Sequence, residues 1–358
     1  MTQLERMRIL CIGETWWGSD ARSAFAALRR LGHSVDIVDE AHFVPTEWES
    51  FAGRALRRMF RSTMASELAR RADKLVRILK PDVLFVFKGN YVTANLVRDA
   101  KSAGVLAVNY YPDVSFFTHG PQLAKALLEY DHVFNAKSFG LADMRAHGVH
   151  SVSFLAPGFD PEVHRPLSLS EAERERFGCD VSFIGTWSPK KEAILSALHE
   201  AAPEIRLRVW GNQWDKRDSK SLDDAVMGVG ITGDDYTRAI CASSISLGLL
   251  SEARAGSSSG DLITARTFQI PACGAFMLHE RNAEVATYFR EGDEAEFFST
   301  SEELVAKVRK YLASSDDRSR VAGGGLQRSH ASDYSIDGRM LDAARAMRDR
   351  LALARTAG

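Results

Sequence analysis

Short apolar segments alternate with segments of helical spacing along the first half of the chain, and this alternation constrains the fold more than any other feature. Buried parallel strands are continuous apolar runs, whereas amphipathic helices repeat apolar residues every three to four positions. The expected strands are Arg8–Gly13, Ser34–Val38, Val83–Phe87, Val105–Tyr110, His132–Asn135 and Ser151–Phe154. Strands that alternate with helices predict a doubly wound parallel sheet with right-handed crossovers.

The same alternation restarts after the polar segment Pro157–Pro166. The expected strands of the second half are Asp180–Ile184, Arg206–Trp210, Ile245–Leu249 and Ala275–Leu278. A chain of 358 residues is long enough for two domains with separate cores. We therefore predict an α/β protein with two Rossmann-like domains, residues 1–165 and 166–336, and a C-terminal helix, 337–358, that packs back on the first domain.

Open parallel sheets bind their ligands outside the carboxyl ends of the strands. Two such sheets in one chain are expected to face a central cleft. The loops that follow the strands are therefore the places where binding and catalytic residues are expected.

Composition excludes several classes of protein. The net charge of −1 argues against a nucleic-acid-binding protein, because phosphate contacts need an excess of basic residues. The four cysteines lie far apart and form no C-x-x-C pair, which argues against a zinc site or a disulfide framework. The first ten residues lack the apolar core of a signal peptide, and no apolar run reaches the ~20 residues of a membrane span. These features predict a cytoplasmic protein.

One segment of the second half, Asp261–Glu280, reads DLITARTFQIPACGAFMLHE. It resembles the C-terminal signature of the CgeB-type (spore maturation protein B) glycosyltransferases, which are relatives of the group 1 transferases and have the pattern R-x-F-E-x-P-A-C-G-A-F-L-L. The matching residues are Arg266, Phe268, Pro271, Ala272, Cys273, Gly274, Ala275 and Phe276. The pieces VSFIGTW, VWG and GDDY precede this segment in the expected order, so the resemblance covers about residues 180–339.

The resemblance implies a GT-B fold and a glycosyltransferase that moves a sugar from a nucleotide-diphosphate sugar, most often a UDP-sugar, to a hydroxyl acceptor. The acceptor would be a glycan, a lipid-linked sugar, a protein or a small molecule. The second domain would bind the donor and the first domain the acceptor. Such hexosyltransferase-like enzymes use no metal and no other cofactor, and no Asp-x-Asp motif lies near the donor segment. Two alternatives are a non-catalytic nucleotide-sugar-binding partner protein and a GT-B sugar-nucleotide epimerase.

The expected donor residues lie in loops and at helix starts of the second domain. Arg266 lies near a predicted helix start, where free N–H groups and the helix dipole favour a diphosphate. Lys190 and Lys191 follow a strand and open a helix, and either lysine could neutralise the leaving diphosphate. Trp210 and Tyr236 are candidates to stack on the base. The full set is Gly185, Thr186, Trp187, Lys191, Trp210, Gly233, Asp234, Tyr236, Asp261, Thr264, Arg266 and Gln269.

The donor segment departs from its relatives at two positions. Related transferases have two glutamates with seven residues between them, and the second holds the ribose hydroxyls. The equivalent residues here are Asp261 and Gln269. A glutamine oxygen accepts a hydrogen bond from a hydroxyl but without charge, which is expected to weaken or alter ribose binding.

The expected acceptor residues follow strands of the first domain. The loop GETWWG holds Trp16 and Trp17, and two adjacent tryptophans in a loop suggest an aromatic platform for a sugar. Asp113 is the first candidate for the base that deprotonates the acceptor, because burial among aromatic residues could raise the pKa of its carboxyl. Capping of a turn is the competing role for Asp113. The other candidate bases are His119 and Glu14, and the remaining acceptor candidates are Lys88, Asn90 and Tyr111.

The segment Arg54–Lys80 combines an apolar helical stripe with basic residues. A helix of this kind can contact an anionic membrane surface, and it can equally be an ordinary solvated helix. Both hypotheses are open at the level of sequence.

Overall fold

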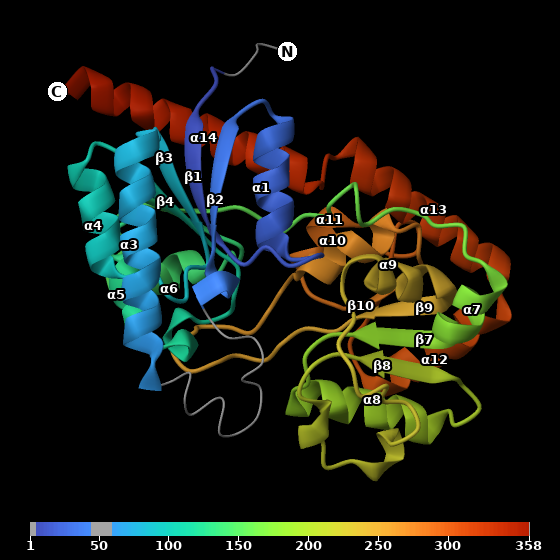
Figure 1. Ribbon diagram of the computed structural model, residues 1–358. Coiled ribbons are helices and arrows are strands. Elements are labelled where there is room, and N and C mark those ends of the chain that lie inside the picture. The colour runs from blue at the N-terminus through green and yellow to red at the C-terminus, as the bar shows by residue number, and fades with distance from the viewer. Residues whose placement is uncertain (1–4, 44–58, 358) are drawn as a thin grey trace. The chain divides into compact units, whose positions relative to one another are not determined.

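A computed structural model describes residues 5–43 and 59–357 (Figure 1). The chain divides into two compact units. Unit 1 consists of Met1–Ala156, Ala253–Ser259 and Ile336–Gly358, and unit 2 consists of Pro157–Glu252 and Gly260–Ser335. Each unit contains one parallel sheet, as the alternation of strands and helices predicts.

Unit 1 has a six-stranded sheet in the order β2-β1-β3-β4-β5-β6, with every pair parallel. Its strands are β1 (Arg8–Gly13), β2 (Ser34–Asp39), β3 (Val83–Phe87), β4 (Leu106–Tyr111), β5 (His132–Asn135) and β6 (Val152–Phe154). Its helices are α1 (Asp20–Arg30), η1 (Glu40–Phe43), α3 (Arg61–Leu79), α4 (Ala94–Ser102), η2 (Phe116–His119), α5 (Pro121–Leu127), α6 (Gly140–His147) and α14 (Ile336–Ala357).

Helices cover both faces of this sheet, and successive residues of β1 show why. Leu10 and Ile12 point into a core shared with α3, α4, α5 and α6. Ile9 and Cys11 point into a second core, which α1 and α14 cover. Because side chains alternate along a strand, a strand between two helical layers must be apolar throughout.

Unit 2 has a five-stranded parallel sheet in the order β11-β10-β9-β7-β8. Its strands are β7 (Cys179–Ile184), β8 (Leu207–Trp210), β9 (Ser243–Gly248), β10 (Met277–Glu280) and β11 (Glu296–Phe298). Its helices are α7 (Glu171–Phe177), α8 (Pro189–Ala201), η3 (Trp214–Lys216), η4 (Lys220–Leu222), α9 (Gly233–Ala242), α10 (Ala265–Ala272), α11 (Val285–Tyr288), α12 (Ser301–Ala313) and α13 (Ser315–Ala331). The main core lies between the sheet and α8, α12 and α13.

Each sheet has one point where the strand order reverses. In unit 1 the chain passes from β1 outward to β2 and then returns to β3 on the other side of β1. In unit 2 it passes from β7 to β8 and returns to β9 on the other side of β7. Crevices for ligands form at such switch points, so the residues after β1, β3, β7 and β9 occupy the positions of functional interest.

The limits of the units differ from the predicted domains. Residues 157–165 belong to unit 2, because Phe159 bridges to Ser335 and the carbonyl of Val163 accepts a hydrogen bond from the Thr237 hydroxyl. The predicted boundary at 165–166 therefore moves to 156–157. The C-terminal helix α14 lies in unit 1, where Arg30 and Asp337 form an ion pair at 2.6 Å.

A short segment of the second half, Ala253–Ser259, also lies in unit 1. The Ser115 hydroxyl donates to the carbonyl of Ala255, and the backbone N–H of Ser258 donates to the Asp143 carboxylate. No sequence pattern indicated this placement.

The basic helix is only partly described. Its first residues, 54–58, lie outside the described part of the chain, and α3 begins at Arg61. Along α3, Arg70 pairs with Glu67 and Arg77 pairs with Asp73, which is typical of a solvated helix face. Among the described residues, no helix is both long enough and apolar enough to cross a membrane.

Candidate functional site

Arg266 lies at the switch point of unit 2. Its Nη1 donates to the carbonyl of Ile184 at the end of β7 (3.3 Å), and its Nη2 donates to the carbonyl of Leu249 just after β9 (2.9 Å). The guanidinium also lies 5.3 Å from the centre of the Phe183 ring. A Cβ on Gly185 would come within 3.0 Å of Nη1, so a glycine leaves the space for this arrangement. The guanidinium therefore bridges the carboxyl ends of the two strands that flank the switch point.

Two lysines from the start of α8 reach the same segment. Lys190 pairs with Glu280 at 2.5 Å, and Lys191, which is buried, donates to the carbonyl of Thr186 (3.1 Å) and the hydroxyl of Ser251 (3.0 Å). The carboxylate of Asp261 accepts from the N–H of Ser251 (3.2 Å).

Three consecutive residues after β9 are thus held by these side chains. Arg266 donates to the carbonyl of Leu249, and Leu250 contacts both Lys190 and Glu280. Ser251 contacts both Lys191 and Asp261. Three cations and two carboxylates gather at this exit from β9. Arginine and lysine side chains that gather at one strand end suit an anionic ligand.

His279, which the sequence analysis did not select, fixes the start of α10. It is fully buried on β10, and its Nδ1 lies 2.7 Å from the carbonyl of Glu280, so Nδ1 carries the proton. Its Nε2 then accepts from the Thr267 hydroxyl (2.9 Å), and that hydroxyl accepts from the N–H of Thr264, the N-cap residue (3.0 Å). Burial, with the charges of Arg266 and Lys190, lowers the pKa of His279 to about 4. A neutral histidine therefore connects β10 to the helix start that holds Arg266.

Gln269 is bonded to Tyr236 of α9. The Tyr236 hydroxyl donates to Oε1 of Gln269 at 2.7 Å, and His164 packs edge-on against the Tyr236 ring with 5.6 Å between centres. Since the amide oxygen accepts from Tyr236, the amide NH₂ is the group that Gln269 can offer to a ligand. This position presents a donor where a carboxylate would present an acceptor.

The end of α10 contains a proline and is followed closely by a strand. Pro271 lies inside the last turn, and the N–H of the C-cap residue Cys273 bonds to the carbonyl of Gln269. Gly274 then adopts a left-handed conformation with φ of 68°, which allows β10 to follow within three residues.

The predicted base-stacking residues have different environments. Trp210 is 3% exposed and lies inside unit 2, which corrects the expectation that its ring stacks on a base. Trp187 is partly exposed, and its indole N–H donates to Glu192 at 2.7 Å. Gly233 and Asp234 lie in the first turn of α9, three and two positions before Tyr236. Of these residues, Trp187 and Tyr236 keep rings that are accessible in part.

In unit 1, the loop after β1 has the expected aromatic character. Trp16 and Trp17 are 47% and 44% exposed. The Trp16 indole N–H lies 3.3 Å from the Glu14 carboxylate, and the Arg22 guanidinium lies 4.2 Å above the Trp17 ring. The loop thus presents two exposed rings, while Glu14 is already bonded to one of them.

Asp113 forms an ion pair with Lys88 and a close contact with His119, and these change its expected role. One of its oxygens, Oδ2, lies 2.8 Å from the Lys88 ammonium and 2.8 Å from Nε2 of His119. Burial opposes ionisation, but Lys88 and His119 together hold the pKa of the Asp113 carboxyl well below its usual range. The structure therefore corrects the expectation of a raised pKa. A carboxylate of this kind orients its neighbour, so His119 becomes the stronger candidate base.

Arg61 connects the two loops that contain Asn90 and His119, close to Asp113. Its Nη2 donates to the carbonyl of Asn90 (2.9 Å) and to the carbonyl of His119 (2.7 Å). In the sequence, Arg61 is distinguished only as part of a basic helical segment. Tyr111 is 1% exposed, and its ring packs near Phe116, which argues against the expected acceptor contact.

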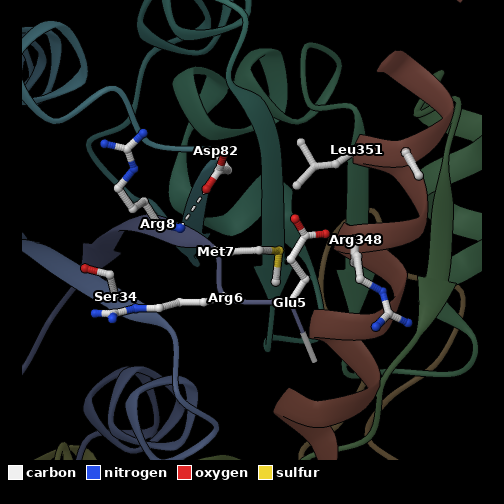
Figure 2. Close-up of a pocket in the computed structure, with 9 residues that line it drawn as sticks. Glu5, Arg6, Met7, Arg8, Ser34, Asp82, Arg348 and Leu351 are labelled. Carbon is white, nitrogen blue, oxygen red and sulfur yellow. Dashed lines mark hydrogen bonds between the residues drawn. The ribbon is translucent and has the colours of Figure 1, made fainter. Parts of the chain in front are cut away.

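A cavity of about 430 Å³ lies at the opposite edge of the unit 1 sheet (Figure 2). It is lined by Glu5, Arg6, Met7, Arg8, Ser34, Asp82, Arg348, Leu351 and Ala352. The backbone N–H of Arg8 donates to Asp82 at 2.7 Å beside it. Because it borders the amino ends of β1, β2 and β3, it is separate from the loops at the switch point.

Comparison with known proteins gives a match of sequence over one region and a match of fold over nearly the whole chain. Residues 190–345 match the model of a family described as glycosyl transferase-like. No curated protein matches the sequence.

Three solved structures illustrate the similarity of fold. Sucrose-phosphate synthase from Thermosynechococcus elongatus is 13% identical, with a TM-score of 0.67 over 97% of this chain and 100% of that one. A glycosyltransferase from Rickettsia africae is 9% identical, with a TM-score of 0.65 over 96% and 98%. HepE from Anabaena, solved in complex with UDP-glucose, is 12% identical, with a TM-score of 0.65 over 96% and 100%.

Two Rossmann-like units with these neighbours define the GT-B class of fold. The match of sequence is confined to residues 190–345, which lie mostly in unit 2.

Proposed function

We propose that this protein transfers a sugar from a nucleotide-diphosphate sugar, of the UDP type, to a hydroxyl acceptor. The observation that supports this most is the cluster of three cationic side chains on the residues that follow β9, namely Arg266, Lys190 and Lys191. A diphosphate leaving group needs such charges, and electrostatic stabilisation is usually the largest catalytic contribution. The complexes of HepE with UDP-glucose and with UDP agree with this choice of donor.

The donor residues are proposed to act as follows. Arg266 and Lys191 stabilise the leaving diphosphate, together with N–H groups at the starts of α8 and α10. Because side chains supply the positive charge, we propose that the reaction needs no metal and no other cofactor. The motif around Arg266 further supports assignment to the CgeB-type subgroup.

The acceptor is proposed to bind unit 1. Trp16 and Trp17 offer exposed faces to a sugar ring. His119 accepts the proton of the attacking hydroxyl, and Asp113 holds the imidazole in place through its 2.8 Å contact. An inverting transfer requires such a base.

Gln269 supports one second candidate, a protein that binds nucleotide sugars without transferring them. Its amide lacks the charge of a carboxylate, and its oxygen already accepts from Tyr236. This candidate predicts nucleotide binding with no turnover when acceptors are supplied.

The test is calorimetric titration of the full chain with UDP and UDP-sugars, followed by a transfer assay with a panel of acceptors. Arg266→Ala removes a charge-assisted contact worth about 1.5–3 kcal/mol, so the affinity for UDP should fall roughly 10- to 150-fold. Arg309→Ala is the matched control, because Arg309 is an exposed arginine of unit 2 that contacts Glu204. Circular dichroism checks that both variants fold. If wild-type protein binds no nucleotide diphosphate, or if folded Arg266→Ala binds as wild type does, the donor site is assigned wrongly.

A further inference from the structure

Two thiols meet in unit 2 on the helices α9 and α10. Cys241 is the last but one residue of α9, and Cys273 caps the end of α10. The Cys241 sulfur lies 3.6 Å from the carbonyl oxygen of Cys273 and 3.8 Å from that of Arg165. The two cysteines are therefore neighbours at the ends of their helices. The other two cysteines, Cys11 and Cys179, are buried in strands.

The two thiols of this pair differ in exposure and acidity. Cys241 is partly exposed, whereas Cys273 is 3% exposed. The neighbouring Cys273, together with the positive charge of Arg165, lowers the pKa of Cys241. Burial raises the pKa of Cys273 well above its usual value. Because the thiolate is the reactive form, Cys241 is the thiol that a reagent meets first.

We propose that Cys241 is a redox modification site whose partner is Cys273, and that a small-molecule disulfide converts the pair into an internal disulfide. The Cys241 thiolate attacks one sulfur of the disulfide, forms a mixed disulfide and releases one thiolate. The Cys273 thiol then loses its proton and attacks the Cys241 sulfur, which forms the internal bond and releases the second thiolate. The two cysteines are oxidised by two electrons, and the small disulfide is reduced to two thiols.

The position of the pair gives the modification a structural consequence. The bond would join the ends of α9 and α10, the two helices that Tyr236 and Gln269 already connect. The proposal does not depend on which reaction the protein catalyses, since its chemistry uses only the two thiols.

The test exposes the full chain to glutathione disulfide at mildly alkaline pH and follows the products by intact mass and peptide mapping. Wild type should lose two hydrogens in mass, and peptides containing Cys241 and Cys273 should become linked. Cys273→Ser should stop at a glutathione adduct on Cys241. Cys241→Ser should leave Cys273 unmodified, because that thiol is buried.

Circular dichroism establishes that each variant is folded, and Cys273→Ala replaces Cys273→Ser if the serine is not tolerated. The wild-type products decide the question by themselves even if no variant folds. The proposal is overturned if Cys241 of wild type stays reduced, if its adduct accumulates without a cross-link, or if the linked peptides contain Cys11 or Cys179.

Discussion

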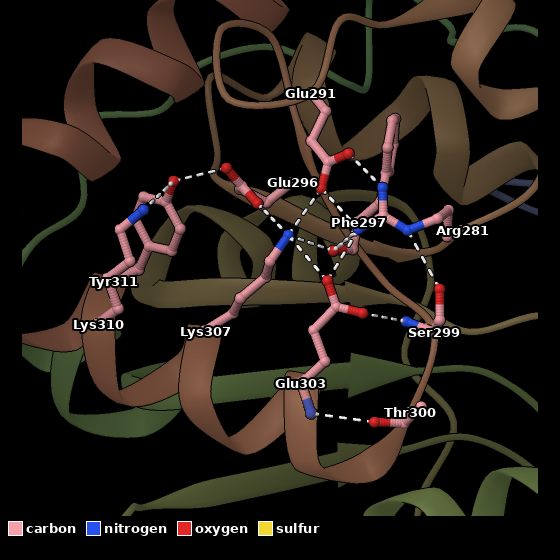
Figure 3. Close-up of polar contacts among 10 residues, drawn as sticks. All are labelled: Arg281, Glu291, Glu296, Phe297, Ser299, Thr300, Glu303, Lys307, Lys310 and Tyr311. Carbon is pink, nitrogen blue, oxygen red and sulfur yellow. Dashed lines mark hydrogen bonds and ion pairs between the residues drawn. The ribbon is translucent and has the colours of Figure 1, made fainter.

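Lys307 provides a prediction whose size follows directly from the structure (Figure 3). Its ammonium donates to Glu291 (2.7 Å), to Glu296 (2.6 Å) and to the carbonyl of Phe297 (2.6 Å). Glu296 is 5% exposed, and its other oxygen accepts from the Tyr311 hydroxyl at 2.6 Å. Lys307→Met keeps much of the side-chain volume but leaves the Glu296 carboxylate buried without its cation.

Removing one partner of a buried ion pair typically costs about 3–5 kcal/mol. We expect the lower end of that range, about 3 kcal/mol, because Lys307 is itself 19% exposed and the bond from Tyr311 remains. For a unit of this size, such a loss lowers the melting temperature by roughly 6–12 °C. Differential scanning calorimetry of the full chain measures the shift.

Two variants make the prediction specific to the buried charge. Lys220→Met removes an exposed lysine from another element of unit 2, η4, and should leave the melting temperature nearly unchanged. Adding Glu296→Gln to Lys307→Met removes the unpaired charge and should recover a large part of the loss. The reasoning fails if Lys307→Met melts within 1 °C or so of wild type, or if the double variant is no more stable than the single one.

Three further predictions concern the candidate site. Gln269→Glu replaces the neutral amide, whose NH₂ is a donor, by a carboxylate that accepts with charge, so titration should show UDP binding about fivefold tighter; weaker binding would contradict the expected contact with the ribose hydroxyls. His119→Ala should lower kcat by about 100-fold or more, and Asp113→Asn should lower it less, in a transfer assay that also records KM; equal activity of His119→Ala and wild type excludes His119 as the base. His279 has a folded pKa of about 4 against an ordinary 6.5, so its neutral form is favoured in the fold. Stability should therefore be complete above about pH 6.5 and should fall by about 3 kcal/mol as the pH approaches 4, and unfolding of His279→Gln across this range should show a smaller loss.

The sheets could be predicted from sequence because their signal is local. Apolar runs such as Val83–Phe87 are continuous in the chain, and the structure contains that strand at the same residues. Arg266 was selected because a helix start and a family motif coincide there. Both kinds of signal lie within about ten residues, which is the distance over which sequence patterns are informative.

The charge states of the site could not be predicted, because they depend on partners distant in sequence. Asp113 owes its low pKa in part to Lys88, which lies on another loop. Glu280 is paired with Lys190, ninety residues away. A sequence places such groups near strand ends, but only the fold determines which of them meet.

The geometry around Arg266 bears on how a diphosphate would be recognised. Its guanidinium is already held by the carbonyls of Ile184 and Leu249, and Gly185 leaves room for it. A side chain fixed before the ligand arrives loses little entropy on binding, so more of the contact energy appears as affinity. Lysine has no second N–H group in a rigid plane and cannot bridge both carbonyls in this way. The planar guanidinium at this position therefore connects two strand ends through its N–H groups, and it also supplies the positive charge for a diphosphate.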